Sequence, residues 1–174
     1  KWLGLESEHA LENRGVSACA TCDGYFFRHQ DVCVVGGGDT AMEEALYLAG
    51  LCKSVTIIHR RQDFRASKIM LERAQKHPAI KFQLDTVVTE VLDVTKNTVT
   101  GLKLKNLVTG EEWVHETQGL FIAIGHQPNT QIFTDWLDLD DNGYLVVQPG
   151  STRTKIEGVF AAGDVADRVY RQAV

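Results

Sequence analysis

Three consecutive glycines, Gly36, Gly37 and Gly38, are the sequence feature that most constrains the fold of this chain. They directly follow residues 31–35, a short apolar and β-branched segment that is typical of a strand buried on both faces of a parallel sheet. After the glycines, alanine and leucine recur every three or four positions from residue 40 to 52, which predicts a helix. Residues 54–58 predict a second strand. The glycines therefore lie inside a strand–helix–strand unit, the crossover that joins parallel strands.

Two further elements extend this unit. Residues 65–76 predict a second helix, with Ile69, Leu71 and Ala74 facing inward. The helix ends just before a proline, because proline disfavours the helical conformation in the residue that precedes it. Residues 80–84 predict a third parallel strand.

Apolar and polar residues alternate in the next part of the chain. Their period of two and short spacing suit a three-stranded antiparallel meander with strands at residues 87–94, 99–107 and 112–117. Apolar runs later in the chain predict strands at residues 119–125, 143–147 and 158–164.

These patterns together predict an α/β fold. Residues 1–124 are expected to form a Rossmann-like dinucleotide-binding domain, with a parallel sheet, crossover helices and the three-stranded meander. The character of the sequence changes after this point, so we assign residues 125–174 to an incomplete segment of a second domain.

Composition and charge exclude several classes of protein. Apolar residues make up 44% and charged residues 24% of the 174 residues, as in ordinary globular domains. The formal net charge is −5 and no basic run is longer than two residues, so we expect no binding to nucleic acids or anionic membranes. The longest apolar stretch, residues 120–124, is too short to span a bilayer. The first residues lack the pattern of a signal peptide, so we expect a cytoplasmic location.

The glycines also predict a binding site. In Gly36-x-Gly38-x-x-Ala41, the first glycine permits a tight turn and the second lets a pyrophosphate approach the backbone. Ala41 keeps the helix close to the strand, and the helix N-terminus presents free N–H groups to the phosphates. The alternative is a glycine turn that serves packing alone.

The end of the second strand selects the nucleotide. Proteins that bind NAD usually place an acidic residue there, about 20 residues after the glycines, to bind the ribose 2′-hydroxyl. This chain instead has His59, Arg60 and Arg61, followed by Arg65. Guanidinium groups bind a 2′-phosphate through charge-assisted hydrogen bonds, which favours NADPH over NADH. The alternative is that these basic residues form a solvated loop.

A Cys-x-x-Cys pair, Cys19 and Cys22, precedes the first strand of this unit. Two thiols at this spacing can close a disulfide ring at the start of a helix, where the helix dipole stabilises a thiolate. Asp23 is placed to move a proton when one sulfur leaves. Zinc is the rival interpretation, but a structural zinc site needs four ligands, and Cys33 and Cys52 do not form a second pair. We favour redox chemistry without a metal, and interpret Cys33 as a core residue.

Five strings in this sequence resemble those of the low-molecular-weight thioredoxin reductases of bacteria and lower eukaryotes. The resemblance extends from about residue 1 to 174, and five motifs in order are more specific than any one of them. The strings are residues 19–24, 36–45, 59–61, 123–129 and 158–165.

The resemblance implies a function. In that family, NADPH reduces FAD, the flavin reduces a disulfide, and the dithiol reduces thioredoxin. Cys19 would be the thiol offered to thioredoxin, Cys22 the sulfur nearer the flavin and Asp23 the acid–base group. The intact enzyme would be a homodimer. The implied cofactor-binding residues for NADPH and FAD are Gly36, Gly38, Asp39, Thr40, Ala41, His59, Arg60, Arg61, Arg65, Ile124, Gly125, Gly163, Asp164, Arg171, Gln172 and Ala173.

The chain departs from the family pattern in one respect. It has a single glycine-rich fingerprint, whereas the family has a second one that binds FAD and lies at the N-terminus of the enzyme. We therefore expect a fragment that comprises the nucleotide domain and part of the FAD domain. Two alternatives are open: the flavoprotein partner of a peroxidase, which shares these motifs, and an NADPH-binding module that is catalytically silent by itself.

Overall fold

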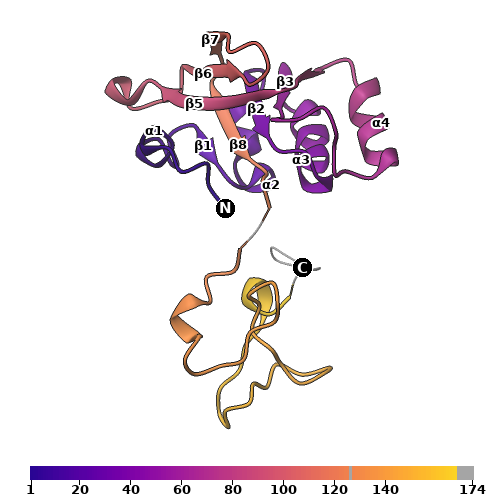
Figure 1. The fold of residues 1–174 in the computed structure, drawn as a ribbon, viewed down its shortest axis with the longest axis vertical. Helices are drawn as coiled ribbons and strands as arrows, with labels where there is room; N and C mark the ends of the chain where they lie inside the picture. Colours follow the sequence, from indigo (N-terminus) through magenta and orange to yellow (C-terminus); the bar gives the residue numbers. More distant parts are fainter. Residues whose placement is uncertain (126, 168–174) are drawn as a thin grey trace. The chain divides into compact units, whose positions relative to one another are not determined.

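The computed structural model describes residues 1–125 and 127–167 (Figure 1). The chain divides into two compact units, Lys1–Gly125 and His126–Val174. A parallel sheet and a three-stranded antiparallel sheet form the first unit, which confirms the predicted α/β fold. Within the described ranges, no helix is long and apolar enough to cross a membrane.

The parallel sheet joins strands that lie far apart in the sequence. Its order is β1 (Val16–Ser17), β8 (Gly119–Ile122), β2 (Asp31–Val35), β3 (Ser54–Ile58) and β4 (Ile80–Gln83). All neighbouring strands are parallel. Figure 1 shows β8, in orange, lying among the indigo and purple strands from the beginning of the chain. The two-residue strand β1 was not predicted, because so short a segment has no detectable period.

The predicted antiparallel meander is formed by the strands that follow β4. They are β5 (Thr86–Leu92), β6 (Gly101–Asn106) and β7 (Glu112–Glu116), with the short helix η2 (Val94–Lys96) between β5 and β6. Val91 pairs with Leu102, which in turn pairs with His115. Val91 and Leu102 are fully buried, so one face of this sheet contributes to the core.

The side chains of the parallel strands contribute to two separate hydrophobic cores. On β2, Val34 packs in the cluster that includes helix α3 (Asp39–Ala49), whereas Cys33 packs in the cluster shared with the antiparallel sheet. Strand β8 alternates in the same way, with Phe121 in the first cluster and Leu120 in the second. Because successive side chains of a strand point to opposite faces, the parallel sheet is the middle of three layers.

The helices differ from the sequence prediction at several points. The short helices α1 (Glu6–Ala10), α2 (Ala20–Asp23) and η1 (Gly24–Phe27) were not assigned ranges from the sequence. Helix α4 (Lys68–Lys76) begins later than the predicted residue 65, because the N–H groups of Arg65 and Ala66 both hold this segment against the Gly37 carbonyl and Ser67 is the N-cap. Ile69, predicted to face inward, is 72% exposed, whereas Ala74 is fully buried as expected.

The second unit contains two 3-10 helices, η3 (Gln131–Phe133) and η4 (Gly163–Val165), among its described residues. Leu137, Leu145 and Ala161 form a small core there. The strands predicted at residues 143–147 and 158–164 are wrong: each segment makes an isolated bridge, Leu139 with Leu145 and Arg153 with Phe160. An apolar run becomes a strand only where a neighbour pairs its backbone groups along its length.

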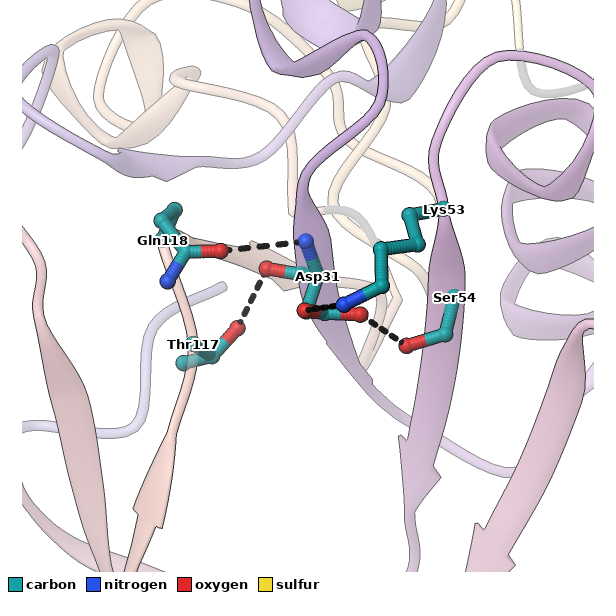
Figure 2. A network of polar contacts seen from close by, with 5 residues as sticks. All are labelled: Asp31, Lys53, Ser54, Thr117 and Gln118. Carbon is teal, nitrogen blue, oxygen red and sulfur yellow. Dashed lines mark hydrogen bonds and ion pairs between the residues drawn. The ribbon is translucent and has the colours of Figure 1, made fainter.

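A polar cluster joins the amino ends of β2, β3 and β8 (Figure 2). The Asp31 carboxylate accepts hydrogen bonds from Ser54 Oγ at 2.5 Å and Lys53 Nζ at 3.0 Å. The Asp31 N–H donates to Gln118 Oε1 at 3.0 Å, and its carbonyl accepts from Thr117 Oγ1 at 2.9 Å. The bonds from Ser54 and then Lys53 lower the pKa of Asp31. This cluster helps to fix the register of three neighbouring strands.

We expect Thr117→Val to lower the free energy of unfolding by about 1–2 kcal/mol. Thr117 is fully buried, so the carbonyl of Asp31 would lose one of its two hydrogen bonds without replacement by water, and would keep only the bond from the Gln118 N–H. Urea denaturation measures the effect. The matched control is Thr89→Val, which removes a bond to the Lys103 carbonyl at an exposed position. Equal losses in the two variants would contradict the importance of burial at Thr117.

Candidate active site

The carboxyl ends of four neighbouring parallel strands lie along one edge of the sheet. The segments that leave this edge carry Cys19 after β1, Ile124 after β8, the glycines after β2 and His59 after β3. In open α/β sheets, ligands bind outside the carboxyl ends of the strands, where the strand order reverses. The topology thus brings the predicted site residues of the first unit to a common edge.

The glycine loop combines one tightly packed position with one open position. A Cβ on Gly36 would collide with the carbonyl oxygen of Ala123 and lie 2.7 Å from the Cβ of Ala41. At Gly38, which precedes the first turn of α3, a Cβ would meet nothing within 4 Å. Gly36 is therefore required for packing, and Gly38 leaves its backbone accessible. Thr40 is half-buried in the first turn of α3.

Backbone hydrogen bonds hold the loop after β3 against the glycine loop. The Gly37 carbonyl accepts from the N–H groups of Arg65 at 2.8 Å and Ala66 at 3.1 Å. The His59 ring fills the space beside Gly37 and stacks on Phe64, with ring centroids 4.8 Å apart. These contacts hold the loop that carries the basic residues beside the glycines.

Asp39 and the three arginines of the basic loop differ in whether their side chains are bonded within the chain. Asp39 accepts a hydrogen bond from the Ser67 N–H at 2.7 Å, so its carboxylate supports the loop before α4. Arg60, Arg61 and Arg65 are exposed, and none of them joins an ion pair within the part of the chain that the structure describes. Three guanidinium groups are therefore available to an anionic ligand beside an accessible helix N-terminus.

Cys19 and Cys22 are joined by a disulfide at the start of α2. Cys19 is the N-cap of this helix, and its sulfur accepts a hydrogen bond from the Cys22 N–H at 3.2 Å. Cys22 is exposed, and Cys19 is half-buried. Ser17 donates a hydrogen bond to the carboxylate of Asp23 at 2.6 Å, which fixes this acid beside the disulfide. Ser17 was not predicted from the sequence, because a serine two residues before a cysteine carries no distinctive signal.

The other two cysteines lie in different surroundings. Burial raises the pKa of the Cys33 thiol to about 12 and that of the Cys52 thiol to about 11. Such thiols are poor nucleophiles, because the thiolate is the reactive form. No cluster of three or more His, Cys, Asp or Glu side chains in residues 1–125 and 127–167 is placed to hold a metal ion. Cys19 and Cys22 are the more accessible of the four cysteines.

This combination of a glycine loop, a basic loop and a disulfide agrees with comparisons to known proteins. A family model described as pyridine nucleotide-disulphide oxidoreductase matches residues 2–174. The chain belongs to this family.

Relatives within the pyridine nucleotide-disulphide oxidoreductases include several thioredoxin reductases. That of Streptomyces coelicolor is 58% identical over 172 residues, covering 99% of this chain and 53% of the relative. The bifunctional thioredoxin reductase/thioredoxin of Mycobacterium leprae is 53% identical over 174 residues, covering 100% of this chain and 38% of the relative. The solved thioredoxin reductase of Streptococcus pyogenes has a TM-score of 0.88 at 41% identity, covering 99% of this chain and 56% of that one. The chain thus spans about half the length of most relatives it matches.

The remaining predicted site residues of this chain lie near the ends of its two units. Ile124 and Gly125 are exposed beyond β8, and Gly125 has a φ of +99°. In the second unit, Gly163 has a φ of +67°, and Asp164 is exposed in η4. The last predicted residues, Arg171, Gln172 and Ala173, lie outside the described part of the chain.

One acidic residue near the dithiol was not predicted as part of the site. Glu44 on α3 accepts a hydrogen bond from the N–H of Ala20, the first residue of α2, and burial raises its pKa to about 7. Glu44 lies three residues after the buried Ala41 and directly before the buried Ala45. This place beside the buried face of the helix is the signal that could have identified it.

We expect Gly36→Ala to lower the free energy of unfolding by about 1–3 kcal/mol, because the added methyl group has no space beside Ala123 and Ala41. Gly38→Ala is the matched control: it adds the same methyl group in open space and should cost at most about 1 kcal/mol as a change of N-cap. Urea denaturation of both variants measures the difference. A larger loss in Gly38→Ala would contradict this account of the loop.

Proposed function

We propose that this chain is the NADPH-binding and dithiol-bearing part of a flavoenzyme that reduces the disulfide of thioredoxin. The observation that carries the proposal is the partly exposed Cys19–Cys22 disulfide at the sheet edge that also carries the glycine loop. The names of the relatives support thioredoxin as the substrate. The proposed enzyme is a homodimer in the cytoplasm, where thiols are kept reduced.

The residues of the first unit fit NADPH. The open position at Gly38 and the N-terminus of the eleven-residue helix α3 suit a pyrophosphate, and a side chain at Gly38 would occupy this space. Arg60 and Arg61, exposed on the loop that is bonded to the glycine loop, suit the 2′-phosphate. We propose residues 1–124 as the NADPH-binding domain.

We propose residues 125–174 as part of an FAD-binding domain. The exposed Gly163–Asp164 segment and the three residues Arg171, Gln172 and Ala173 are proposed to contact FAD, by resemblance to the family's C-terminal segment. When bound, NADPH and FAD supply the electron pair that reaches the disulfide.

Reduction breaks the bond between Cys19 and Cys22, and each sulfur gains one electron and, in the thiol form, one proton. Asp23 is the proposed acid–base group, and the hydrogen bond from Ser17 holds its carboxylate in place. Cys19 is proposed to attack the disulfide of thioredoxin, which forms a mixed disulfide. Cys22 then attacks Cys19, restores the Cys19–Cys22 bond and releases reduced thioredoxin.

We expect the double substitution Arg60→Ala and Arg61→Ala to weaken the binding of NADPH by at least about tenfold, because each charge-assisted contact contributes on the order of 1.5–3 kcal/mol. The binding of NADH, which has no 2′-phosphate, should change much less. Calorimetric titration of both nucleotides measures the preference. Arg14→Ala with Arg73→Ala removes the same charge from other exposed positions and serves as the control. Equal losses for both nucleotides would count against a 2′-phosphate site.

The redox assignment can be tested in an enzyme that holds FAD, made by exchanging this chain for the matching stretch of the Streptomyces coelicolor thioredoxin reductase. We expect Cys19→Ser to reduce the NADPH-dependent reduction of thioredoxin by at least about a thousandfold, because the nucleophile is lost. Reduction of the flavin by NADPH should persist. The matched control, Cys52→Ser, replaces a cysteine outside the pair and should retain activity.

Two results would contradict the proposal. A Cys19→Ser enzyme that reduces thioredoxin at the parental rate would show that this thiol is not the nucleophile. A parental exchange enzyme that reduces its flavin but leaves thioredoxin oxidised would favour a different protein substrate, such as the carrier of a peroxidase. A Cys22→Ser enzyme separates the two sulfurs, because Cys19 should then retain thioredoxin as a stable mixed disulfide.

A further inference from the structure

Glu44 is a half-buried acid that lies between the two parts of the candidate active site. It lies on α3, the helix that begins at the glycine loop, and its carboxylate accepts a hydrogen bond from the Ala20 N–H. The second carboxylate oxygen, Oε2, is buried without a hydrogen-bond partner among the described residues. An acid in this position has few partners to stabilise its charge, so its protonation state responds to the charges around it.

Helix α2 is closely packed on α3 at both of its ends. Ala20 is 1% exposed and belongs to the same core cluster as Ala45 and Leu48 of α3. Gly24, which follows α2, approaches α3 so closely that an added Cβ would lie 2.8 Å from Leu48 Cδ2. Because Ala20 directly follows Cys19, the carboxylate of Glu44 bonds to the amide next to the first sulfur-bearing residue.

We propose that Glu44 is a positioning residue of the dithiol, which holds the first turn of α2 through the Ala20 N–H and binds a proton when a thiolate forms at Cys19 or Cys22. This inference rests on the proposed function in so far as the pair must cycle between disulfide and dithiol. It adds a residue that neither the motifs nor the family resemblance assigned.

The charges around Glu44 favour such coupling. Burial raises the pKa of Glu44 to about 7, the hydrogen bond from Ala20 opposes this shift, and the negative charge of Glu43 adds to it. The described elements packed against α3 carry other titratable groups, which are not among the causes of the shift. These groups are Asp23 on α2, Asp31 and Cys33 on β2, Lys68, Glu72, Arg73 and Lys76 on α4, and Lys81 on β4.

The sign of the coupling follows from charge. Below about pH 7 the carboxyl of Glu44 is protonated and neutral, and above it the carboxylate is negative. A thiolate next to a negative carboxylate is disfavoured, so formation of the thiolate raises the pKa of Glu44. When dithiothreitol reduces the pair, its two thiols give up two electrons and two protons and form a cyclic disulfide. Cys19 and Cys22 gain the two electrons. One proton binds one sulfur, and where the other sulfur stays a thiolate, the second proton binds Glu44.

The experiment uses Glu44→Gln in the full chain, equilibrated with mixtures of reduced and oxidised dithiothreitol at pH 5.5 and pH 8.5. Mass spectrometry of alkylated peptides gives the reduced fraction of Cys19 and Cys22. Glutamine keeps a hydrogen-bond acceptor for Ala20 but carries no charge. At pH 8.5 we expect the disulfide of the variant to be reduced more readily than that of the parent. The equilibrium constant for reduction should rise by up to about tenfold for each unit by which Glu44 raises the pKa of the thiol. At pH 5.5 we expect little change.

Controls separate coupling from a purely structural role. Glu72→Gln removes an exposed charge on α4 and should match the parent at both pH values. Glu44→Ala also loses the bond to Ala20, so it should change the reduced fraction of Cys19 and Cys22 at both pH values. Glu44→Gln keeps an acceptor for this bond, so it should match the parent at pH 5.5 but not at pH 8.5. Equal shifts in Glu44→Gln at pH 5.5 and pH 8.5, or no shift at either, would overturn the proposal.

A second measurement requires no variant. Carbon-13 NMR of the Glu44 carboxyl gives its pKa in the disulfide and dithiol forms of the unmodified chain, and we expect the higher pKa in the dithiol form. The same pKa in both forms would overturn the coupling. Neither experiment uses NADPH, flavin or thioredoxin. Both therefore test the coupling between Glu44 and the cysteine pair independently of the proposed enzyme function.

Discussion

The parallel pairing of β1, β8, β2 and β3 is the constraint on which the candidate active site depends. Parallel strands run in one direction, so the segments that follow them leave the sheet at a single edge. Because β1 pairs with β8 and β8 pairs with β2, all in parallel, Cys19 and Gly36 leave the sheet at the same edge although they belong to different motifs. An antiparallel β1 would instead place the disulfide at the edge opposite the glycine loop without changing either motif.

The two ends of the sheet differ in how their polar groups are satisfied. At the amino end, Asp31 is bonded to Lys53, Ser54 and the residues that precede β8, and this end serves structure. At the carboxyl end, Arg60 and Arg61 are exposed beside an accessible glycine. Charged groups that structure does not use are the ones available to a ligand, which agrees with the proposed nucleotide site.

Helix α3 has a part in both halves of the proposed chemistry. Its N-terminus faces the position expected for phosphates, Ala41 keeps it close to β2, and its middle packs against the helix that carries the disulfide. Glu44 lies at this second contact, where burial disfavours its charge. A rigid helix that touches both motifs provides a direct physical connection between them, because packed helices do not deform independently.

The sequence by itself determined the elements whose signals are local. The apolar run before Gly36, the glycines and the alternating residues 87–117 were sufficient to predict the α/β fold and the meander. The basic residues from His59 and the Cys-x-x-Cys spacing indicated a candidate site, whose residue roles stay a prediction. Only the tertiary structure decided what depends on distant partners. It showed that Ile69 is exposed, that residues 158–164 form no extended strand, and that Glu44 contacts Ala20. Burial and pairing are properties of neighbours in space, and a local pattern does not specify those neighbours.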